Sequence, residues 1–68
     1  MNPQIFTEQM RKLEAAFREP QSERYRDVYW EHLKELKDDQ FIRTVGYWIR
    51  NKSKFPTISE LLGAAQWK

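Results

Sequence analysis

Apolar residues recur along the first part of the chain at the spacing of a single helix face. The repeating positions are Phe6, Met10, Leu13 and Phe17. Intervals of four, three and four residues place these side chains on one stripe of an α-helix. Asn2 is suited to cap this helix, and Pro3 to occupy its first turn, where a missing N–H costs nothing. Pro20 ends it.

Two further apolar stripes predict a second and a third helix. Ser22 is expected to cap the second, whose stripe consists of Tyr25, Tyr29, His32 or Leu33, and Leu36. Asp38 is expected to cap the third, which begins near Asp39. The broad apolar face of the third helix consists of Phe41, Ile42, Val45, Trp48 and Ile49. Gly46 weakens this helix and is expected to let a neighbouring helix approach closely.

A strong start signal for a fourth helix follows a polar loop over residues 51–54. Thr57 and Glu60 have the spacing of a capping box, and Gly63 is a candidate for an early end. The alternating period of a β-strand is absent from the sequence. We therefore predict an all-α fold, a compact bundle of three to four short helices. It forms one domain over residues 1–68, or the folded part of a longer protein.

Composition restricts the chemistry that this chain can support. Its 68 residues include no cysteine and one histidine, which excludes thiolate and histidine-cluster metal sites. We expect no metal and no cofactor, and a reducing, cytoplasmic compartment. No apolar run approaches the roughly 20 residues that span a bilayer, so no membrane partner is expected. The net charge of +2 is too small to indicate a nucleic-acid binder by itself.

Candidate catalytic residues are few and have simpler explanations. His32 would need an orienting partner and a nucleophile, and its sequence neighbourhood supplies neither. We interpret it as a structural histidine on the inner side of the second helix. Asp38 and Asp39 are explained as helix-start charges, and Glu31 and Glu35 as a solvated helix face. The chain is therefore not expected to be an enzyme.

The third helix carries the clearest candidate for a binding surface. Arg43, Tyr47 and Arg50 fall together on the side opposite its apolar face. Residues 40–55 contain four basic side chains and no acidic one. Three interpretations remain open: ordinary solvated residues, a surface for an acidic protein, or a surface that binds nucleic acid. The predicted partner-binding residues are Arg43, Tyr47, Arg50, Lys54 and Trp30.

Two tryptophans exceed what a small core requires. Trp30 either packs against the terminal helix or belongs to a contact patch. Trp67, next to the last residue, is either docked on the domain or part of an interface.

The order of features over residues 25–61 resembles the N-terminal domain of phage replicative-helicase loaders and inhibitors. Tyr29 and Leu33 match an aromatic and a leucine four residues apart, and Lys37-Asp38-Asp39 matches a short acidic turn. The closing motif is Phe55-Pro56-Thr57-Ile58-Ser59-Glu60-Leu61. The chain has one proline after the phenylalanine where the family usually has two, and tyrosine where the family usually has tryptophan.

The resemblance implies a non-catalytic accessory or adaptor protein of phage or mobile-element DNA replication. Such a protein would dock on a helicase, primase, polymerase or initiator. The main alternative is a small domain that binds single-stranded DNA through the same face. A third hypothesis is a homo-oligomer that completes its core by association.

Overall fold

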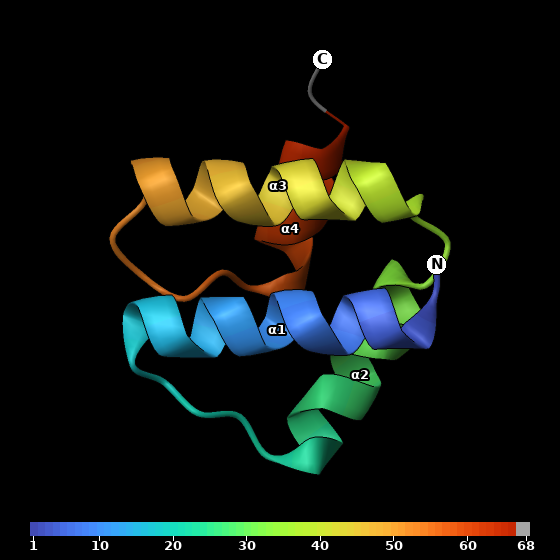
Figure 1. Ribbon diagram of the computed structural model, residues 1–68, viewed down its shortest axis with the longest axis horizontal. Coiled ribbons are helices and arrows are strands. Elements are labelled where there is room, and N and C mark those ends of the chain that lie inside the picture. Colours follow the sequence, from blue (N-terminus) through green and yellow to red (C-terminus); the bar gives the residue numbers. More distant parts are fainter. Residues whose placement is uncertain (67–68) are drawn as a thin grey trace.

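Residues 1–66 form four helices. The computed structural model describes residues 1–66. The helices are α1 (Pro3–Phe17), α2 (Glu23–Leu33), α3 (Asp38–Asn51) and α4 (Ile58–Ala65) (Figure 1). Residues 1–66 contain no strand, and the predicted small all-α bundle is confirmed. None of these helices has the length and apolar character needed to cross a membrane.

Three of the helix starts are capped as the sequence predicts. The side chains of Asn2 and Ser22 accept hydrogen bonds from backbone N–H groups in the first turns of α1 and α2. At α4, the Thr57 hydroxyl accepts from the Glu60 N–H at 3.2 Å, and the Glu60 carboxylate accepts from the Thr57 N–H at 2.9 Å. These bonds satisfy backbone donors that a helix start leaves unpaired.

The predicted N-cap of the third helix is wrong by one residue, and the candidate end of the fourth helix is not used. The N-cap of α3 is Lys37, and Asp38 is the first residue of the helix. The Asp38 carboxylate instead accepts a 2.9 Å hydrogen bond from the Asn2 N–H, so it joins the starts of α1 and α3. Gly63 does not end α4, which continues to Ala65.

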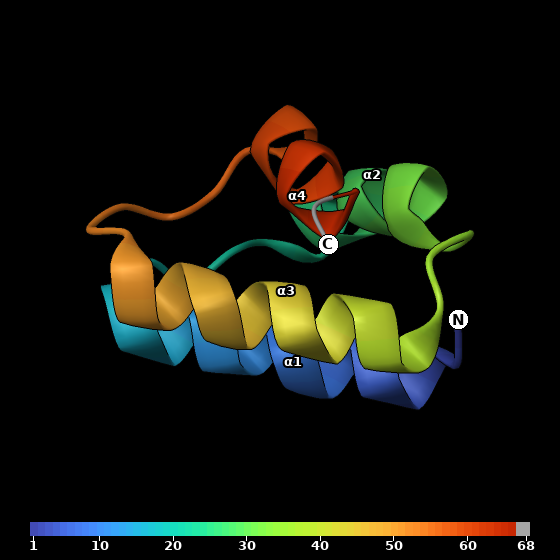
Figure 2. The ribbon, with the colours of Figure 1, turned by 90° about the horizontal axis from the view of Figure 1, so that it is seen from above.

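The helices form two layers. In Figures 1 and 2, α1 and α3 lie side by side and run in the same direction, while α2 and α4 cross behind them. The ring of Phe6 stacks on that of Phe41, with centroids 5.8 Å apart, between the two parallel helices. Because α1 and α3 are parallel, α2 must return the chain to the same end of the domain.

The core lies between these layers and takes residues from all four helices. Its buried apolar members are Phe6, Met10, Leu13, Leu33, Phe41, Val45, Trp48, Leu61 and Ala65. Two polar residues, Gln9 and Thr44, are also buried. The Thr44 hydroxyl is paired, because it donates a 2.7 Å hydrogen bond to the Gln40 carbonyl.

Three residues assigned to apolar or inner faces lie outside instead. His32 is exposed, and its neighbour Leu33 is the buried residue. Tyr25 is 60% exposed because it stands near the free start of α2, and Ile42 is 39% exposed at the margin of α3. Tyr25 and Ile42 lie at the edges of the predicted apolar stripes, where no neighbouring helix covers them fully.

Candidate functional site

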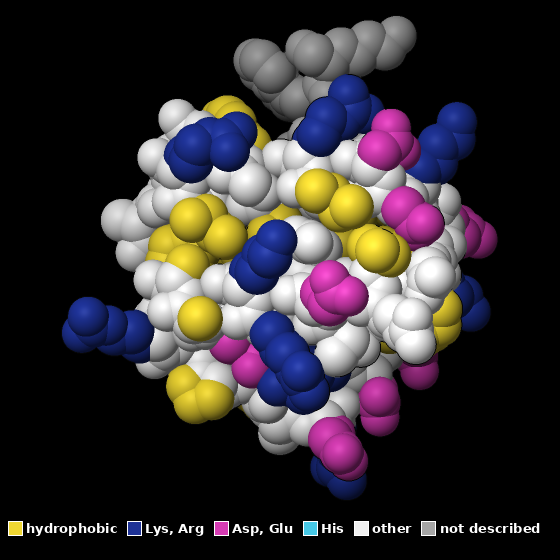
Figure 3. All heavy atoms as spheres, in the orientation of Figure 1, with side chains coloured by type: hydrophobic (Ala, Val, Ile, Leu, Met, Phe, Trp, Pro, Cys, Tyr) yellow, Lys and Arg dark blue, Asp and Glu magenta, His cyan; other side chains and the backbone are white. Residues whose placement is uncertain are grey.

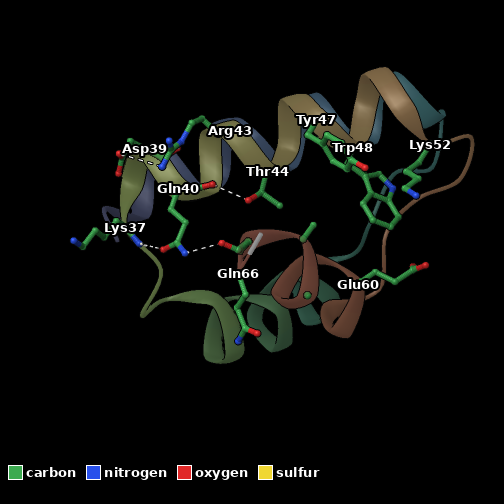
Figure 4. Close-up of a pocket in the computed structure, with 13 residues that line it drawn as sticks. Lys37, Asp39, Gln40, Arg43, Thr44, Tyr47, Trp48, Lys52, Glu60 and Gln66 are labelled. Atoms are coloured by element: carbon green, nitrogen blue, oxygen red, sulfur yellow. Dashed lines mark hydrogen bonds and ion pairs between the residues drawn. The ribbon is translucent and has the colours of Figure 1, made fainter. Parts of the chain in front are cut away.

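A groove of about 1170 Å³ lies between α3 and α4. The α3 side includes Gln40, Arg43, Thr44, Tyr47 and Trp48, and the α4 side includes Gly63, Ala64 and Ala65 (Figure 4). The bulky residues stand on α3, whereas the last turns of α4 present small side chains and Glu60 lines the groove nearer the start of α4. This difference in size leaves the space open.

Hydrogen bonds fix the geometry at both ends of the groove. Near the start of α3, the Gln40 amide donates to the Ala65 carbonyl at 2.9 Å (Figure 4). Near its end, the Trp48 indole N–H donates to the Lys54 carbonyl at 2.7 Å. The first bond joins α3 directly to the last turn of α4. The second holds the loop that leads into α4.

Tyr47 and Arg43 stand at the rim of the groove. Tyr47 is 45% exposed, so a large part of it is accessible to a ligand. The Arg43 guanidinium lies 3.6 Å from the Asp39 carboxylate, but both side chains are about three-quarters exposed. An ion pair in that setting stabilises little, so the Arg43 guanidinium stays available to a ligand.

The other end of the rim carries two lysines and one carboxylate. The Lys52 ammonium lies 5.5 Å from the centre of the Trp48 ring, a cation–π distance. Glu60 is 3.4 Å from the Lys54 ammonium. The Thr57 N–H, and after it Lys54, hold the pKa of Glu60 below its ordinary value. Glu60 is therefore ionised and already partnered at neutral pH.

The structure brings together only part of the predicted binding surface. Arg43, Tyr47 and Arg50 are all exposed on α3, as their spacing predicts. Arg43 and Tyr47 line the groove, but Arg50 and Lys54 are not among the lining residues. Lys54 instead takes part at the rim through its pair with Glu60.

Gly46 does not provide the predicted close approach between helices. A Cβ placed on it would lie 3.3 Å from a guanidinium nitrogen of Arg50, and its three nearest neighbours all belong to that side chain. The Arg50 side chain therefore folds back along α3 over the glycine. This places its charge against the helix and outside the groove.

Trp30 belongs to a different part of the molecule. It is half-buried, and its ring meets that of Phe6 edge-on with centroids 5.2 Å apart. The partner in this contact is α1, whereas the core interpretation placed Trp30 against the terminal helix. A shallow hollow beside it includes Pro3 and Arg26. Trp67 lies outside the described residues.

The face formed by α1 and α3 has mixed character. Basic side chains are spread over it among acidic and apolar ones and do not gather into one patch (Figure 3). Within residues 1–66, no three His, Asp or Glu side chains are grouped as metal ligands. The groove between α3 and α4 is larger than the hollow beside Trp30 and is the candidate binding site.

No protein-family model matches the chain, and no curated protein or solved structure is significantly similar to it. The resemblance to helicase loaders stays a prediction. The α4 side of the groove was missed by sequence reasoning, because small residues give no periodic signal. The buried position of Thr44 was predictable from the sequence, because Thr44 stands three residues after Phe41 and four before Trp48, at helical spacing from both.

Proposed function

We propose that this chain is a non-catalytic accessory protein that binds a partner protein through the α3–α4 groove. The observation that carries the proposal is the exposed ring of Tyr47 at the rim of an open groove, beside the available guanidinium of Arg43. Tyrosine and arginine are enriched among the residues that dominate protein interfaces. The domain would act by adhesion and steric placement of its partner.

The setting that we propose is phage or mobile-element DNA replication in the cytoplasm. The partner would be a helicase, primase, polymerase or initiator. This setting is supported by the helicase-loader-like motifs, two of which contribute to a single contact. Tyr29, from the aromatic–leucine pair, donates a hydrogen bond to Pro56 of the closing motif.

Binding of single-stranded DNA is the second candidate, because the Tyr47 ring could stack on a base beside Arg43. Mixed charge disfavours it, since Asp39 and Glu60 also line the groove. The lining cations are Lys37, Arg43 and Lys52. One phosphate contact for each of these three cations predicts that the affinity for single-stranded DNA falls about 20-fold when the salt concentration rises fourfold.

Biolayer interferometry separates the two candidates. The immobilised chain is presented with purified replicative helicase, primase, polymerase and initiator, and with single- and double-stranded oligonucleotides, each at two salt concentrations. We expect one replication protein to bind, with weaker salt dependence than a phosphate-bound strand, and Arg43→Glu to reduce that binding. Binding to oligonucleotides alone, with the steep salt dependence, would establish the second candidate instead.

A further inference from the structure

The polar groups on the floor of the groove are already used within the domain. The Thr44 hydroxyl donates to the Gln40 carbonyl, and the Trp48 indole N–H donates to the Lys54 carbonyl, both at 2.7 Å. Within residues 1–66, no fully buried side-chain nitrogen or oxygen lacks a hydrogen-bond partner. The floor therefore offers a ligand apolar contact and few free donors or acceptors.

Gly63 leaves open space on the α4 side of the groove. It is exposed within α4, and a Cβ placed on it would meet nothing within 4 Å. Its neighbours Ala64 and Ala65 add only methyl groups. Figure 4 shows the Trp48 ring reaching from α3 towards α4, which provides an aromatic wall at one end of this space.

The cations at the two ends of the groove favour a ligand with separated carboxylates over an evenly charged strand, because Asp39 and Glu60 also line the groove. Glu60 is paired with Lys54, whereas Asp39 forms only the exposed, weak pair with Arg43. Lys37 and Lys52 form no ion pair with any residue in 1–66. These lysines cap the two ends of α3 and are therefore about 22 Å apart at 1.5 Å per residue. An extended segment of about seven residues covers that distance.

We infer that the groove binds an acidic peptide segment of the partner, anchored by one aromatic or long aliphatic side chain beside Gly63. Carboxylates on either side of the anchor meet Lys37 and Lys52 at the two ends, and Tyr47 covers the anchor from the rim. This inference rests on the proposed role as a protein-binding module. It does not depend on which replication protein is the partner.

Selection from a random-peptide display library tests the inference without a known partner. The whole chain is the target, and affinities of recovered peptides are then measured by fluorescence anisotropy. Gly63→Leu fills the groove with a better helix former than glycine, and Gly63→Ala is its matched control. The double variant Lys37→Glu/Lys52→Glu reverses the end charges. Its control is Lys12→Glu/Lys34→Glu, which reverses two exposed lysines outside the groove.

We expect recovered peptides to be rich in Asp and Glu around a single large apolar residue. Their affinity should fall at least about tenfold on Gly63→Leu and on the Lys37/Lys52 variant, and change by less than about twofold on the controls. Circular dichroism verifies that every variant keeps its helical content. Recovery of no peptides, of peptides without acidic enrichment, or of peptides that bind Gly63→Leu as tightly as the parent would overturn the inference.

Two outcomes separate this inference from the proposed function. If acidic peptides bind in the groove but no replication protein does, the proposed function fails and the inference stands. If a replication protein binds equally well to Gly63→Leu, the inference fails and the proposed function stands. Sedimentation at two concentrations adds a check, because self-association that Gly63→Leu abolishes would make a second copy the occupant and overturn the acidic-peptide assignment.

Discussion

The Tyr29 hydroxyl donates a 2.7 Å hydrogen bond to the carbonyl of Pro56. Residues 27 positions apart are joined by this bond, which fixes α2 against the loop that leads into α4. The ring of Phe55 packs edge-on against Tyr29 at 6.2 Å, and Pro56 is fully buried. The position of α4, and therefore of one wall of the groove, depends on this contact.

Tyr29→Phe is expected to lower the free energy of unfolding by about 1–2 kcal/mol, because the Pro56 carbonyl loses its partner in a buried setting. That corresponds to a fall in Tm of roughly 4–16 °C for a domain of this size. Thermal unfolding followed by circular dichroism measures it. Tyr25→Phe is the matched control, since Tyr25 is 60% exposed and its hydroxyl forms no hydrogen bond within residues 1–66.

The same hydroxyl gives the stability an alkaline pH dependence. Burial, and after it the Glu60 carboxylate, raise the pKa of Tyr29. The neutral phenol is thus favoured by folding. Its contribution is complete below the ordinary tyrosine pKa of about 10 and is lost as the pH rises through the raised value. The Tyr29→Phe variant should lack this component of alkaline destabilisation. An unchanged alkaline profile would contradict the assignment.

Glu14 gives stability an acidic pH dependence. Its carboxylate accepts two hydrogen bonds from the Arg26 guanidinium, at 2.8 and 2.7 Å, and its side chain is 10% exposed. The hydrogen bond from Arg26 is the main reason why the pKa of Glu14 is lowered. The ionised form is favoured by folding, so its contribution is complete above the ordinary glutamate pKa of about 4.3 and is lost as the pH falls through the lowered value.

Glu14→Gln should therefore cost about 1–2 kcal/mol at pH 7, and the difference from the parent should shrink below about pH 4. Urea unfolding measured from neutral pH to pH 3 gives the comparison. Glu8→Gln, an exposed change in the same helix, should have almost no effect at any pH. A difference between Glu14→Gln and the parent that stays constant down to pH 3 would show that ionisation of Glu14 does not contribute.

The helix starts were predictable because capping is a local interaction. Asn2, Ser22 and Thr57 each satisfy a donor within three residues, so the sequence neighbourhood contains the whole interaction. Asp38 was assigned wrongly for the opposite reason. Its carboxylate bonds to Asn2, 36 residues away, and no local pattern predicts that contact.

The candidate site was predictable on α3 and not on α4. The exposure of Tyr47 follows from its position opposite Phe41 and Val45 on one helix. The groove requires knowledge of where α4 crosses α3, which depends on distant contacts such as the one between Gln40 and Ala65. Gly63 was therefore only a candidate helix end in the sequence, whereas in the structure α4 continues past it and a Cβ on it would meet open space.

The two helical glycines predict gains of different size on substitution by alanine. Gly63→Ala should raise the free energy of unfolding by about 0.5–1 kcal/mol, because alanine loses less conformational freedom in a helix and its Cβ meets nothing within 4 Å. Gly46→Ala should gain less, since its Cβ would lie 3.3 Å from the Arg50 guanidinium and that side chain must move. Differential scanning calorimetry compares the two variants. A larger gain at Gly46 would contradict the position of Arg50.

Substitutions across the predicted binding residues distinguish the groove from the broader cationic surface of α3. Tyr47→Ala should weaken binding of an acidic peptide with an aromatic anchor by at least about tenfold, as expected of a central interface tyrosine. Arg50→Glu should change the affinity by less than about threefold, because its side chain lies over Gly46 and outside the groove.

Trp30→Phe, on the side facing α1, should leave the affinity unchanged. Tyr25→Ala controls for the loss of an exposed tyrosine on α2. Fluorescence anisotropy measures all four affinities, and equal losses for Tyr47→Ala and Arg50→Glu would assign binding to the outer surface of α3 instead of the groove.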